Sequence, residues 1–375
     1  MWQADDSLQE PAADAFALVG GGESREGTLR TVPDSHRDKR APLGVILNAG
    51  LGTRLRPITP ALPKALVPVL NRPLIDYSME FLTKLGLREI VLVVSPGDTA
   101  TGTRAREVAA PGVQVHIAIQ EEARGIGDAV VSAGALLDGR SVAVLAADTL
   151  LIGDTTRYIE LFGASDAAAG LVLAPVDDPR AFGVAILEGD RVVDLEEKPA
   201  NPRSDLALVG LWLLGAPAIE RLRANPNINA RGEADLTGTI VVMLSEGAPV
   251  VGWCTTGAWL DAGTVDGLLN AHTRLLAPMG ASGRVLGNSA ITGALAAGAG
   301  AEAHGSELAG PVMLGAGTHV QDSMVAWSVL GDGAKVRGAR LERCVVLAGA
   351  VVDGGSYHDV VFTAAGEVAG PGAAA

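Results

Sequence analysis

A buried strand that runs into a glycine-rich turn is the feature that most constrains this fold. Leu43 to Leu47 form an apolar run, and Gly50 and Gly52 follow it closely. An uninterrupted apolar run of this kind is typical of a strand that helices cover on both faces of a parallel sheet. Glycines at its end let backbone N–H groups approach an anion without a Cβ in the way. The chain is therefore expected to form an α/β domain with an anion-binding turn.

Strand-like and helix-like segments alternate beyond this turn. Apolar runs predict strands over residues 90–94, 113–119, 141–146, 168–175, 184–187 and 208–214. Amphipathic stretches predict helices over residues 72–86, 127–137 and 236–245, whereas residues 105–109 are too short to assign. Such alternation is typical of a doubly wound, Rossmann-like α/β sheet, in which ligands bind at the carboxyl ends of the strands.

The texture of the chain changes after about residue 280, where glycine, alanine and valine dominate. Aliphatic residues recur there every five or six positions, at Leu314, Val320, Val325, Leu330, Val336, Leu341, Val346 and Val351. In a β-solenoid each short rung buries one such side chain, so this cadence predicts a β-helix. The alternative is an irregular β region rich in alanine and glycine.

Composition and charge exclude several classes of protein. Hydrophobic residues make up 48% of the chain and charged residues 19%, so a sizeable core can form. The net charge of −14 argues against nucleic acid as a partner, because an acidic surface repels a phosphate backbone. No apolar run is long enough for a membrane span, and no signal peptide is evident. Two isolated cysteines are typical of the reducing cytoplasm, where we expect the protein to act.

Cationic side chains surround the glycine turn. Arg54 and Arg56 lie directly after it, and Lys64 follows Pro63 in the next loop. Arginine grips phosphate with two parallel hydrogen bonds, and lysine adds a point charge. A dinucleotide fingerprint would need a third glycine where Leu55 stands, and a Walker loop would need Gly-Lys-Ser or Gly-Lys-Thr. The turn therefore indicates a phosphate site of another kind.

The combination of Gly-Leu-Gly-Thr-Arg-Leu-Arg-Pro over residues 50–57 with Pro-Lys-Ala-Leu-Val-Pro over 63–68 resembles the signature of the sugar nucleotidyltransferases. Further segments resemble the family in the family's order: Gln120 with Gly125–Ala129, Asp148, Phe182–Val184, Glu197–Pro199, Arg231–Glu233 and Trp259–Thr264. The stretch from Asp178 onward is similar to the long form of glucose-1-phosphate thymidylyltransferase, which also carries a C-terminal left-handed β-helix. We therefore expect a catalytic domain over 43–280 and a β-helix over 281–365. Residues 1–42 show no apolar periodicity and are expected to be a disordered tail, as are residues 366–375 at the other end.

The resemblance also implies a reaction and a set of site residues. A nucleoside triphosphate, dTTP being favoured, would react with a sugar 1-phosphate, favoured as glucose 1-phosphate, to give an NDP-sugar and pyrophosphate with Mg²⁺ as cofactor. The implied residues are Arg54 and Lys64 for catalysis, Leu47, Asn48, Ala49, Gly50, Gly52, Thr53, Gln120 and Gly125 for the nucleotide, Thr149, Gly183, Glu197, Lys198 and Arg231 for the sugar phosphate, and Asp148 and Asp261 for the metal. A homo-oligomer is expected.

Three departures from the family pattern leave the substrates open. Asn48 stands where alanine or serine is usual, Thr149 follows Asp148 where asparagine is usual, and Gly238 replaces a usual aspartate. The same chemistry with GTP or another nucleotide, and with another sugar or cyclitol phosphate, is the alternative. Two other classes are a non-catalytic regulator that senses an NDP-sugar and a bifunctional enzyme whose β-helix acetylates sugars.

Overall fold

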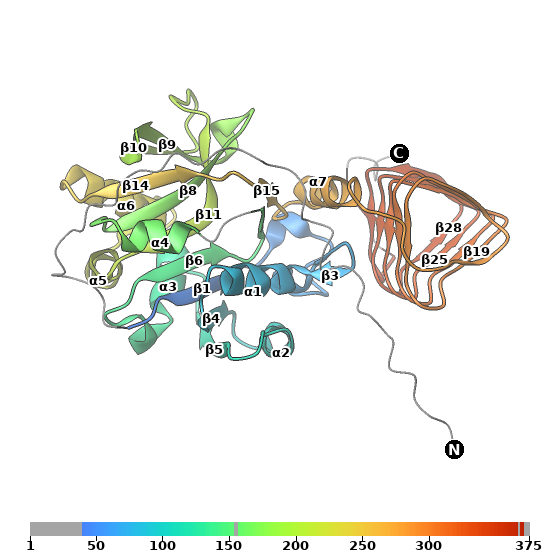
Figure 1. The fold of residues 1–375 in the computed structure, drawn as a ribbon, viewed down its shortest axis with the longest axis horizontal. Helices are drawn as coiled ribbons and strands as arrows, with labels where there is room; N and C mark the ends of the chain where they lie inside the picture. The colour runs from blue at the N-terminus through green and yellow to red at the C-terminus, as the bar shows by residue number, and fades with distance from the viewer. Residues whose placement is uncertain (1–39, 154–156, 367, 371–375) are drawn as a thin grey trace, which may run out of the picture. The chain divides into compact units, whose positions relative to one another are not determined.

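A computed structural model of the chain describes residues 40–153, 157–366 and 368–370, which form an α/β domain and a parallel β-helix (Figure 1). Of the tail predicted over residues 1–42, only 40–42 are described, and they are irregular. Of the tail predicted over 366–375, residues 367 and 371–375 lie outside the described residues. Within the described residues, the first regular element is the predicted first strand, which begins at Leu43.

The α/β domain is built on a nine-stranded sheet in the order β5-β4-β1-β6-β11-β8-β14-β10-β9. Strands β5, β4, β1 and β6 are parallel, and β11 runs antiparallel to both β6 and β8. The strands span Leu43–Asn48 (β1), Glu89–Val94 (β4), Gln114–Ile119 (β5), Val142–Ala146 (β6), Ala169–Pro175 (β8), Gly183–Glu188 (β9), Arg191–Glu197 (β10), Leu206–Leu214 (β11) and Val250–Cys254 (β14). Each apolar run that predicted a strand forms one.

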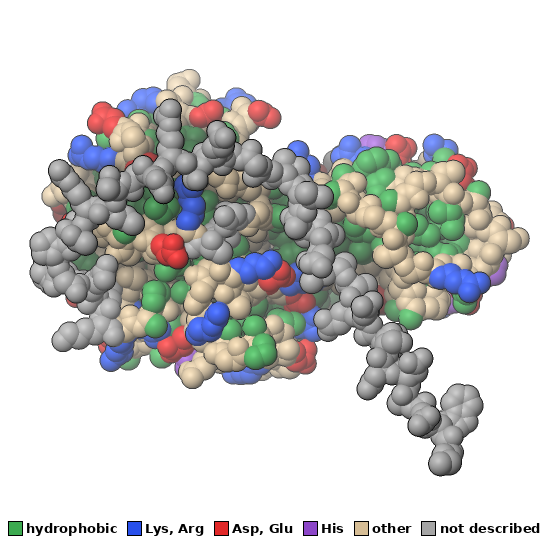
Figure 2. Space-filling model, in the orientation of Figure 1, with side chains coloured by type: hydrophobic (Ala, Val, Ile, Leu, Met, Phe, Trp, Pro, Cys, Tyr) green, Lys and Arg blue, Asp and Glu red, His purple; other side chains and the backbone are tan. Residues whose placement is uncertain are grey.

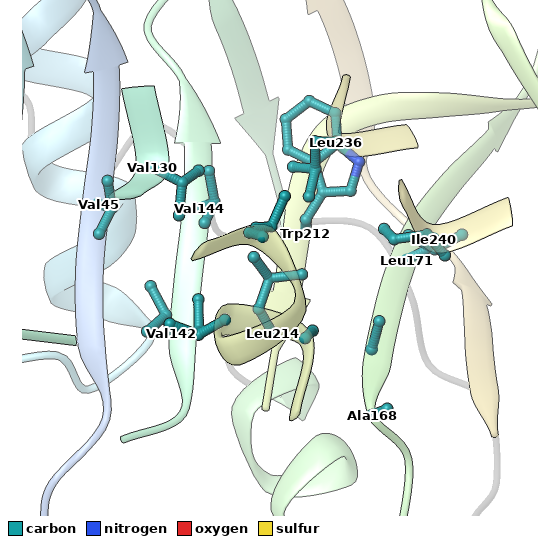
Figure 3. Packing of buried hydrophobic residues seen from close by; sticks show 14 of the residues in the cluster. Val45, Val130, Val142, Val144, Ala168, Leu171, Trp212, Leu214, Leu236 and Ile240 are labelled. Atoms are coloured by element: carbon teal, nitrogen blue, oxygen red, sulfur yellow. The ribbon is translucent and has the colours of Figure 1, made fainter. Parts of the chain in front are cut away.

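Helices cover both faces of this sheet, and each face has its own buried core. Helices α3 (Ile126–Val131), α5 (Ala216–Ala224) and α6 (Leu236–Ser245) pack on one face, which Figure 3 shows from close by. Helices α1 (Leu74–Lys84), α2 (Thr99–Glu107) and α4 (Arg157–Gly163) pack on the other. Because side chains alternate along a strand, Val45 joins the first core and Ile46 the second. The Rossmann-like α/β architecture is therefore confirmed.

Two of the predicted helices have different bounds. The helix expected over residues 127–137 ends at Val131, and a short 3-10 helix follows over Gly134–Leu137. Gly134 has a φ of 59°, a conformation that does not continue an α-helix. The helix expected over residues 72–86 begins only at Leu74, because Arg72–Pro73 (β3) pairs with Pro68–Val69 (β2) instead.

Helix α2 was not assigned from the sequence. Its only apolar side chains are alanines, so it carries no hydrophobic stripe that a periodicity argument could detect. Its start is marked instead by Asp98, whose carboxylate accepts a hydrogen bond from the Thr101 backbone N–H at 3.0 Å. None of the helices in the described residues has the length and apolarity needed to cross a bilayer.

The β-helix consists of three sheets of short strands, which are parallel except that Val368–Ala369 (β31) pairs antiparallel with Val361–Phe362 (β30) in the third sheet. The first holds Leu286–Gly287 (β16), Glu302–His304 (β19), His319–Gln321 (β22), Lys335–Arg337 (β25) and Val351–Asp353 (β28). The second holds Ala290–Thr292 (β17), Glu307–Ala309 (β20), Met324–Ala326 (β23), Arg340–Glu342 (β26) and Ser356–His358 (β29). The third holds Leu295–Ala297 (β18), Val312–Leu314 (β21), Val329–Leu330 (β24), Val345–Val346 (β27), Val361–Phe362 (β30) and Val368–Ala369 (β31).

The repeat of this β-helix follows from its register. Val320 pairs with Val336 and Val336 with Val352, so one full coil takes 16 residues there. Three rungs of five or six residues make one such coil, as the aliphatic cadence predicted. One member of the predicted series is wrong: Val351 is 47% exposed, whereas Val352 is buried in the coil's core. On the face shown in Figure 2 the β-helix presents mostly hydrophobic and uncharged surface.

A further buried cluster lies beneath the glycine turn. Leu55 and Ile58, which follow that turn, share it with helix α7 (Val265–Leu276) and with Val345, Leu347 and Val361 of the β-helix. His272 of α7 is fully buried there, and its ring meets the Leu70 N–H at 3.3 Å and the Pro68 carbonyl at 3.1 Å. The loop that carries the cationic side chains therefore rests on a rigid apolar base.

Candidate functional site

Most of the predicted site residues lie along the carboxyl edge of the sheet. Gln120 follows β5, Ala49 follows β1 and Asp148 follows β6. Neighbouring strands are spaced by about 4.8 Å, so the edge from β5 to β6 extends about 14 Å, which matches the reach of a nucleotide from base to phosphate. The Ser95 hydroxyl after β4 donates to the Ala49 carbonyl at 2.8 Å and ties the middle of this edge together.

The turn after β1 requires glycine at position 52. Gly52 has a φ of 60°, and a Cβ there would lie 2.8 Å from the Thr59 methyl group. The Thr59 hydroxyl also donates to the Gly52 carbonyl at 2.8 Å, which fixes the turn. Gly50 is exposed and has no atom near the position of a Cβ, so its backbone is open to a ligand. Thr53 and Arg54 follow in a 3-10 turn with exposed side chains.

Four charged side chains converge at the end of β6. The Lys64 ammonium donates to Asp148 Oδ2 at 2.5 Å, and Arg54 Nη2 lies 3.9 Å from the same oxygen. Asp261 reaches them because Ala258–Asp261 (β15) pairs with Thr149–Ile152 (β7), which places Asp261 opposite Thr149. Arg54, Lys64 and Asp148 are thus brought together with Asp261, which comes from a distant part of the chain.

Gly263 shows how closely the two carboxylates approach. A Cβ at this position would collide with the Asp148 carboxylate and would lie 2.9 Å from Asp261 Oδ1. The Gly263 N–H donates to Asp261 Oδ1 at 2.8 Å, and a side chain here would fill the space between the two acids. The sequence reasoning missed Gly263 as a site residue, although the Asp-Ala-Gly spacing after β15 was a usable signal.

The Asp261 carboxylate is mostly buried beside a second acid. Burial raises the pKa of Asp261, the neighbouring Asp148 charge raises it further, and the Gly263 N–H, Arg54 and Lys64 oppose the rise. Oxygen donors of this kind suit Mg²⁺, which proteins hold with one or two carboxylates while substrate phosphates and waters complete the shell. Among the described residues no group of three or more His, Cys, Asp or Glu side chains is placed to hold a metal ion.

The other end of the edge is organised around Gln120. Its Nε2 donates to the Gly125 carbonyl at 3.0 Å and to Asp128 Oδ2 at 2.8 Å. Gly125 has a φ of 100°, and a Cβ on it would lie 2.5 Å from the Ala234 carbonyl oxygen. Asp128 is a second residue that the sequence reasoning missed. An acidic residue in the first turn of a helix is usually explained by the helix dipole alone.

The Asn48 side chain is buried and hydrogen-bonded within the protein. Its side chain is 4% exposed, its Oδ1 accepts from the Ala65 N–H at 3.1 Å, and its Nδ2 donates to Asp98 Oδ2 at 3.1 Å. The amide therefore supports the loop that carries Lys64 and joins it to the start of α2. Any contact of Asn48 with a nucleotide must come from its backbone, as for Leu47 and Ala49.

The predicted sugar residues on β9 and β10 lie together. Gly183 and Glu197 are partners across these strands, and a Cβ on Gly183 would lie 3.0 Å from Glu197 Oε2. Lys198 adopts a φ of 47°, its N–H donates to the Phe182 carbonyl at 3.0 Å, and its ammonium lies 3.6 Å from Glu197 Oε1. Both charged side chains are more than half exposed.

Thr149 and Arg231 stand apart from this pair. The Thr149 hydroxyl is buried and donates to the Val209 carbonyl at 2.9 Å. Arg231 lies in the loop between Asn227–Ile228 (β12) and Ala234–Asp235 (β13), with its side chain 76% exposed and 3.0 Å from Glu233. No contact joins Arg231 to Lys198 among the described residues, so the structure does not itself assemble a sugar-phosphate clamp.

Comparisons with known proteins identify the family of the chain. A family model described as nucleotidyl transferase matches residues 43–277. A glucose-1-phosphate thymidylyltransferase of Streptomyces antibioticus is 33% identical over 318 residues, which cover 83% of this chain and 88% of that protein. The same enzyme of Streptomyces griseus is 34% identical over 316 residues, with the same shares. A solved structure of a proposed glucose-1-phosphate thymidylyltransferase from Bacillus anthracis is 28% identical, with a TM-score of 0.57 over 65% of this chain and 98% of that one.

Proposed function

The chain belongs to the nucleotidyl transferase family and is a sugar-1-phosphate nucleotidyltransferase, and we propose that it makes dTDP-glucose from dTTP and glucose 1-phosphate. One observation carries the reaction class: Asp148, Asp261, Arg54 and Lys64 converge beside an open glycine turn. The choice of dTTP and glucose 1-phosphate is supported by the names of the Streptomyces relatives, which align with most of the chain.

The reaction requires positioning more than acid–base chemistry. An oxygen of the sugar phosphate bonds to the α-phosphorus of the triphosphate, the bond from that phosphorus to the bridging oxygen breaks, and pyrophosphate leaves. The attacking oxygen is already anionic at neutral pH, so no general base is needed. Catalysis then depends on holding two anions in line and neutralising their charge.

The cationic side chains suit the two parts of the triphosphate. Arg54 is 65% exposed at the rim of the turn, where it can bind the β- and γ-phosphates that leave as pyrophosphate. Lys64 is largely buried against Asp148, where it can hold the phosphate at which the new bond forms. The backbone from Leu47 to Thr53 would bind the nucleotide, with Gly50 and Gly52 allowing close approach.

Asp148 and Asp261 would hold Mg²⁺ between them. When bound, the ion would neutralise phosphate charge and polarise the reacting phosphoryl group. Lys64 already pairs with Asp148, so the negative charge of Asp148 is partly neutralised before any ligand binds. Asp261 has no such partner at hydrogen-bond distance except the Gly263 N–H, and its raised pKa is the signature of a carboxylate that a cation would stabilise.

The sugar phosphate would bind on the far side of this cluster. Lys198 and Arg231 supply charge for its phosphate, and Glu197, the Gly183 backbone and Thr149 supply partners for its hydroxyl groups. Thr149 is adjacent in sequence to Asp148 and opposite Asp261, which joins the sugar side to the metal side. The exposure of Lys198 and Arg231 means that the acceptor itself must draw these side chains together.

The proposal is tested by following pyrophosphate release from purified protein with Mg²⁺, glucose 1-phosphate and each of dTTP, UTP, GTP, ATP and CTP. We expect release with dTTP well above the others. Release with GTP or another nucleotide would replace dTTP in the proposal. If none of the five nucleotides gives pyrophosphate release, the same panel is repeated with other sugar and cyclitol phosphates. No release in that panel either would favour a regulator that only binds an NDP-sugar.

Three structural and cellular properties complete the proposal. We propose that the β-helix is left-handed, that the protein forms a homo-oligomer, and that it acts in the cytoplasm, where Cys254 and Cys344 stay reduced as the unpaired thiols that the structure shows. Light scattering on the purified protein measures the oligomeric state, and a single protomer mass would reject it.

A further inference from the structure

We propose that Asp128 sets the choice of base by locking the Gln120 amide so that its oxygen, and not its NH₂ group, faces the nucleotide. The inference rests on the proposed function, because it assigns the base of the donor triphosphate to the β5 end of the site. It predicts acceptance of bases whose ring nitrogen on the pairing edge carries a hydrogen, namely thymine, uracil and guanine. Cytosine and adenine would be rejected.

The orientation of the amide follows from chemistry and not from a choice between two similar atoms. Gln120 Nε2 lies 3.0 Å from the Gly125 carbonyl oxygen and 2.8 Å from an oxygen of Asp128. A backbone carbonyl and an ionised carboxylate can only accept hydrogen bonds, so the atom facing them must be the NH₂ group. Both of its hydrogens are thereby used, and the amide oxygen points away from both partners.

The lock is held by rigid neighbours. Asp128 lies in the first turn of α3, and the start of that helix packs tightly on the β13 segment, where a Cβ on Gly127 would lie 3.1 Å from the Ala234 carbonyl oxygen. The Ala234 N–H also donates to the Arg124 carbonyl at 2.6 Å, immediately before Gly125. Gln120 itself is 5% exposed and begins from the end of β5. The Gln120 amide therefore cannot rotate without breaking one of these packed contacts.

The amide oxygen of Gln120 is available to a ligand. Among the described residues no donor reaches this oxygen, and it is not one of the buried side-chain atoms left without a partner. It is therefore accessible at the carboxyl edge, about 14 Å along that edge from Asp148, given three strand spacings of about 4.8 Å. A base at one end and the reacting phosphate at the other would fit this separation.

A fixed acceptor discriminates strongly between bases. Thymine, uracil and guanine present a ring N–H to it, whereas cytosine and adenine present a ring nitrogen whose lone pair would face the amide oxygen. A buried acceptor left without its donor costs enough to lower specificity by roughly 10- to 100-fold. A role for Asp128 in helix stability alone would instead change the rates with all nucleotides by the same factor.

The test compares two pyrimidine donors that differ on this edge. We would measure kcat/KM for dTTP and dCTP with glucose 1-phosphate in the wild type, in Asp128→Leu, which removes the acceptor at similar size, and in Asp128→Asn. Asp138→Asn is the matched control, because Asp138 is an exposed acid that pairs with Arg223 and has no contact with Gln120. The fall in the dTTP-to-dCTP ratio is expected to be at least about tenfold in Asp128→Leu and smaller in Asp128→Asn.

The outcomes separate this inference from the proposed function. A ratio that is unchanged in both folded Asp128 variants would overturn the lock, whatever happens to the absolute rates. If the wild type shows no turnover with any acceptor, the proposed function fails, but calorimetric binding of dTTP and dCTP still measures the same ratio. A wild type that binds the two nucleotides equally would also overturn the lock. Thermal melting of each variant shows whether it is folded.

Discussion

Two regions of the proposed active site differ in how firmly their side chains are held in place. We call the region of Asp148 and Asp261 the metal end, and the region of Lys198 and Arg231 the sugar end. At the metal end Lys64 is 18% exposed and bonded to Asp148, and Asp261 is held by the Gly263 N–H. At the sugar end the side chains of Lys198 and Arg231 are 60% and 76% exposed and pair with the neighbouring Glu197 and Glu233. The metal end rests on the buried cluster around α7, whereas the sugar end is carried by a bulged hairpin and a loop. In the proposed function, the chemical step would therefore use the more rigidly held region and sugar recognition the more exposed one.

The largest effect is expected from a substitution at the metal end. Asp148→Asn keeps the shape of the side chain but removes the charge that faces Lys64, Arg54 and the metal. We expect kcat to fall at least about a hundredfold, because a metal ligand and a phosphate-orienting contact are lost together. Steady-state pyrophosphate release measures the change, and thermal melting checks the fold.

Asp353→Asn is the control for this variant, because Asp353 is an exposed acid of the β-helix that pairs only with Arg337. Its activity should equal that of the wild type. Near-normal turnover in Asp148→Asn would remove the metal assignment and with it the contrast between the two ends.

A smaller effect, on stability, is expected from the titration of His272, which lies in the buried cluster beneath the metal end. Burial lowers the pKa of His272 to about 4, against a weaker opposing effect of the Pro68 carbonyl. The unfolded chain, with an ordinary histidine pKa of about 6.5, therefore binds more protons than the folded chain between these values. Stability is full above pH 6.5 and is lost as the pH falls toward 4, with about 2 kcal/mol gone by pH 5.

Urea unfolding at pH 7 and pH 5 measures this loss, and His272→Gln isolates it. Glutamine can replace both hydrogen bonds of the ring, to the Leu70 N–H and the Pro68 carbonyl, but it does not titrate. The variant should lose less stability between the two pH values than the wild type. His304→Gln on the β-helix surface, where the ring is 56% exposed, should keep the wild-type loss. Equal losses in the wild type and His272→Gln would contradict the prediction.

The sequence could predict those parts of the structure that depend on local chemistry. The strand and turn around Gly52 follow from residues within one loop, because Gly52 has a left-handed backbone in which a Cβ would collide with the nearby Thr59. The coil of the β-helix could also be predicted, because one rung repeats the pattern of the last. The error at Val351 arose within a run of two valines, where periodicity alone does not decide which side chain points inward.

Contacts between distant segments could not be predicted in this way. Asn48 meets Asp98, fifty residues later, and its role as a support for the Lys64 loop exists only once β1 and α2 are adjacent. Gly263 joins the site because β15 pairs with β7. Asp128 resembled an ordinary helix residue until Gln120 was placed against it. In each case the residue type was visible, but its partner was not.

The smallest effect is expected at the sugar end, and it tests the difference between the two ends most directly. Lys198→Met removes the ammonium but keeps an unbranched side chain at an exposed position. Because Lys198 would act in binding and not at the reacting phosphorus, we expect KM for glucose 1-phosphate to rise about tenfold while kcat changes little. Lys84→Met is the control, since Lys84 is an equally exposed lysine that pairs with Glu80 on α1. A fall in kcat at unchanged KM would place Lys198 with the catalytic groups, and the two ends would then act as one.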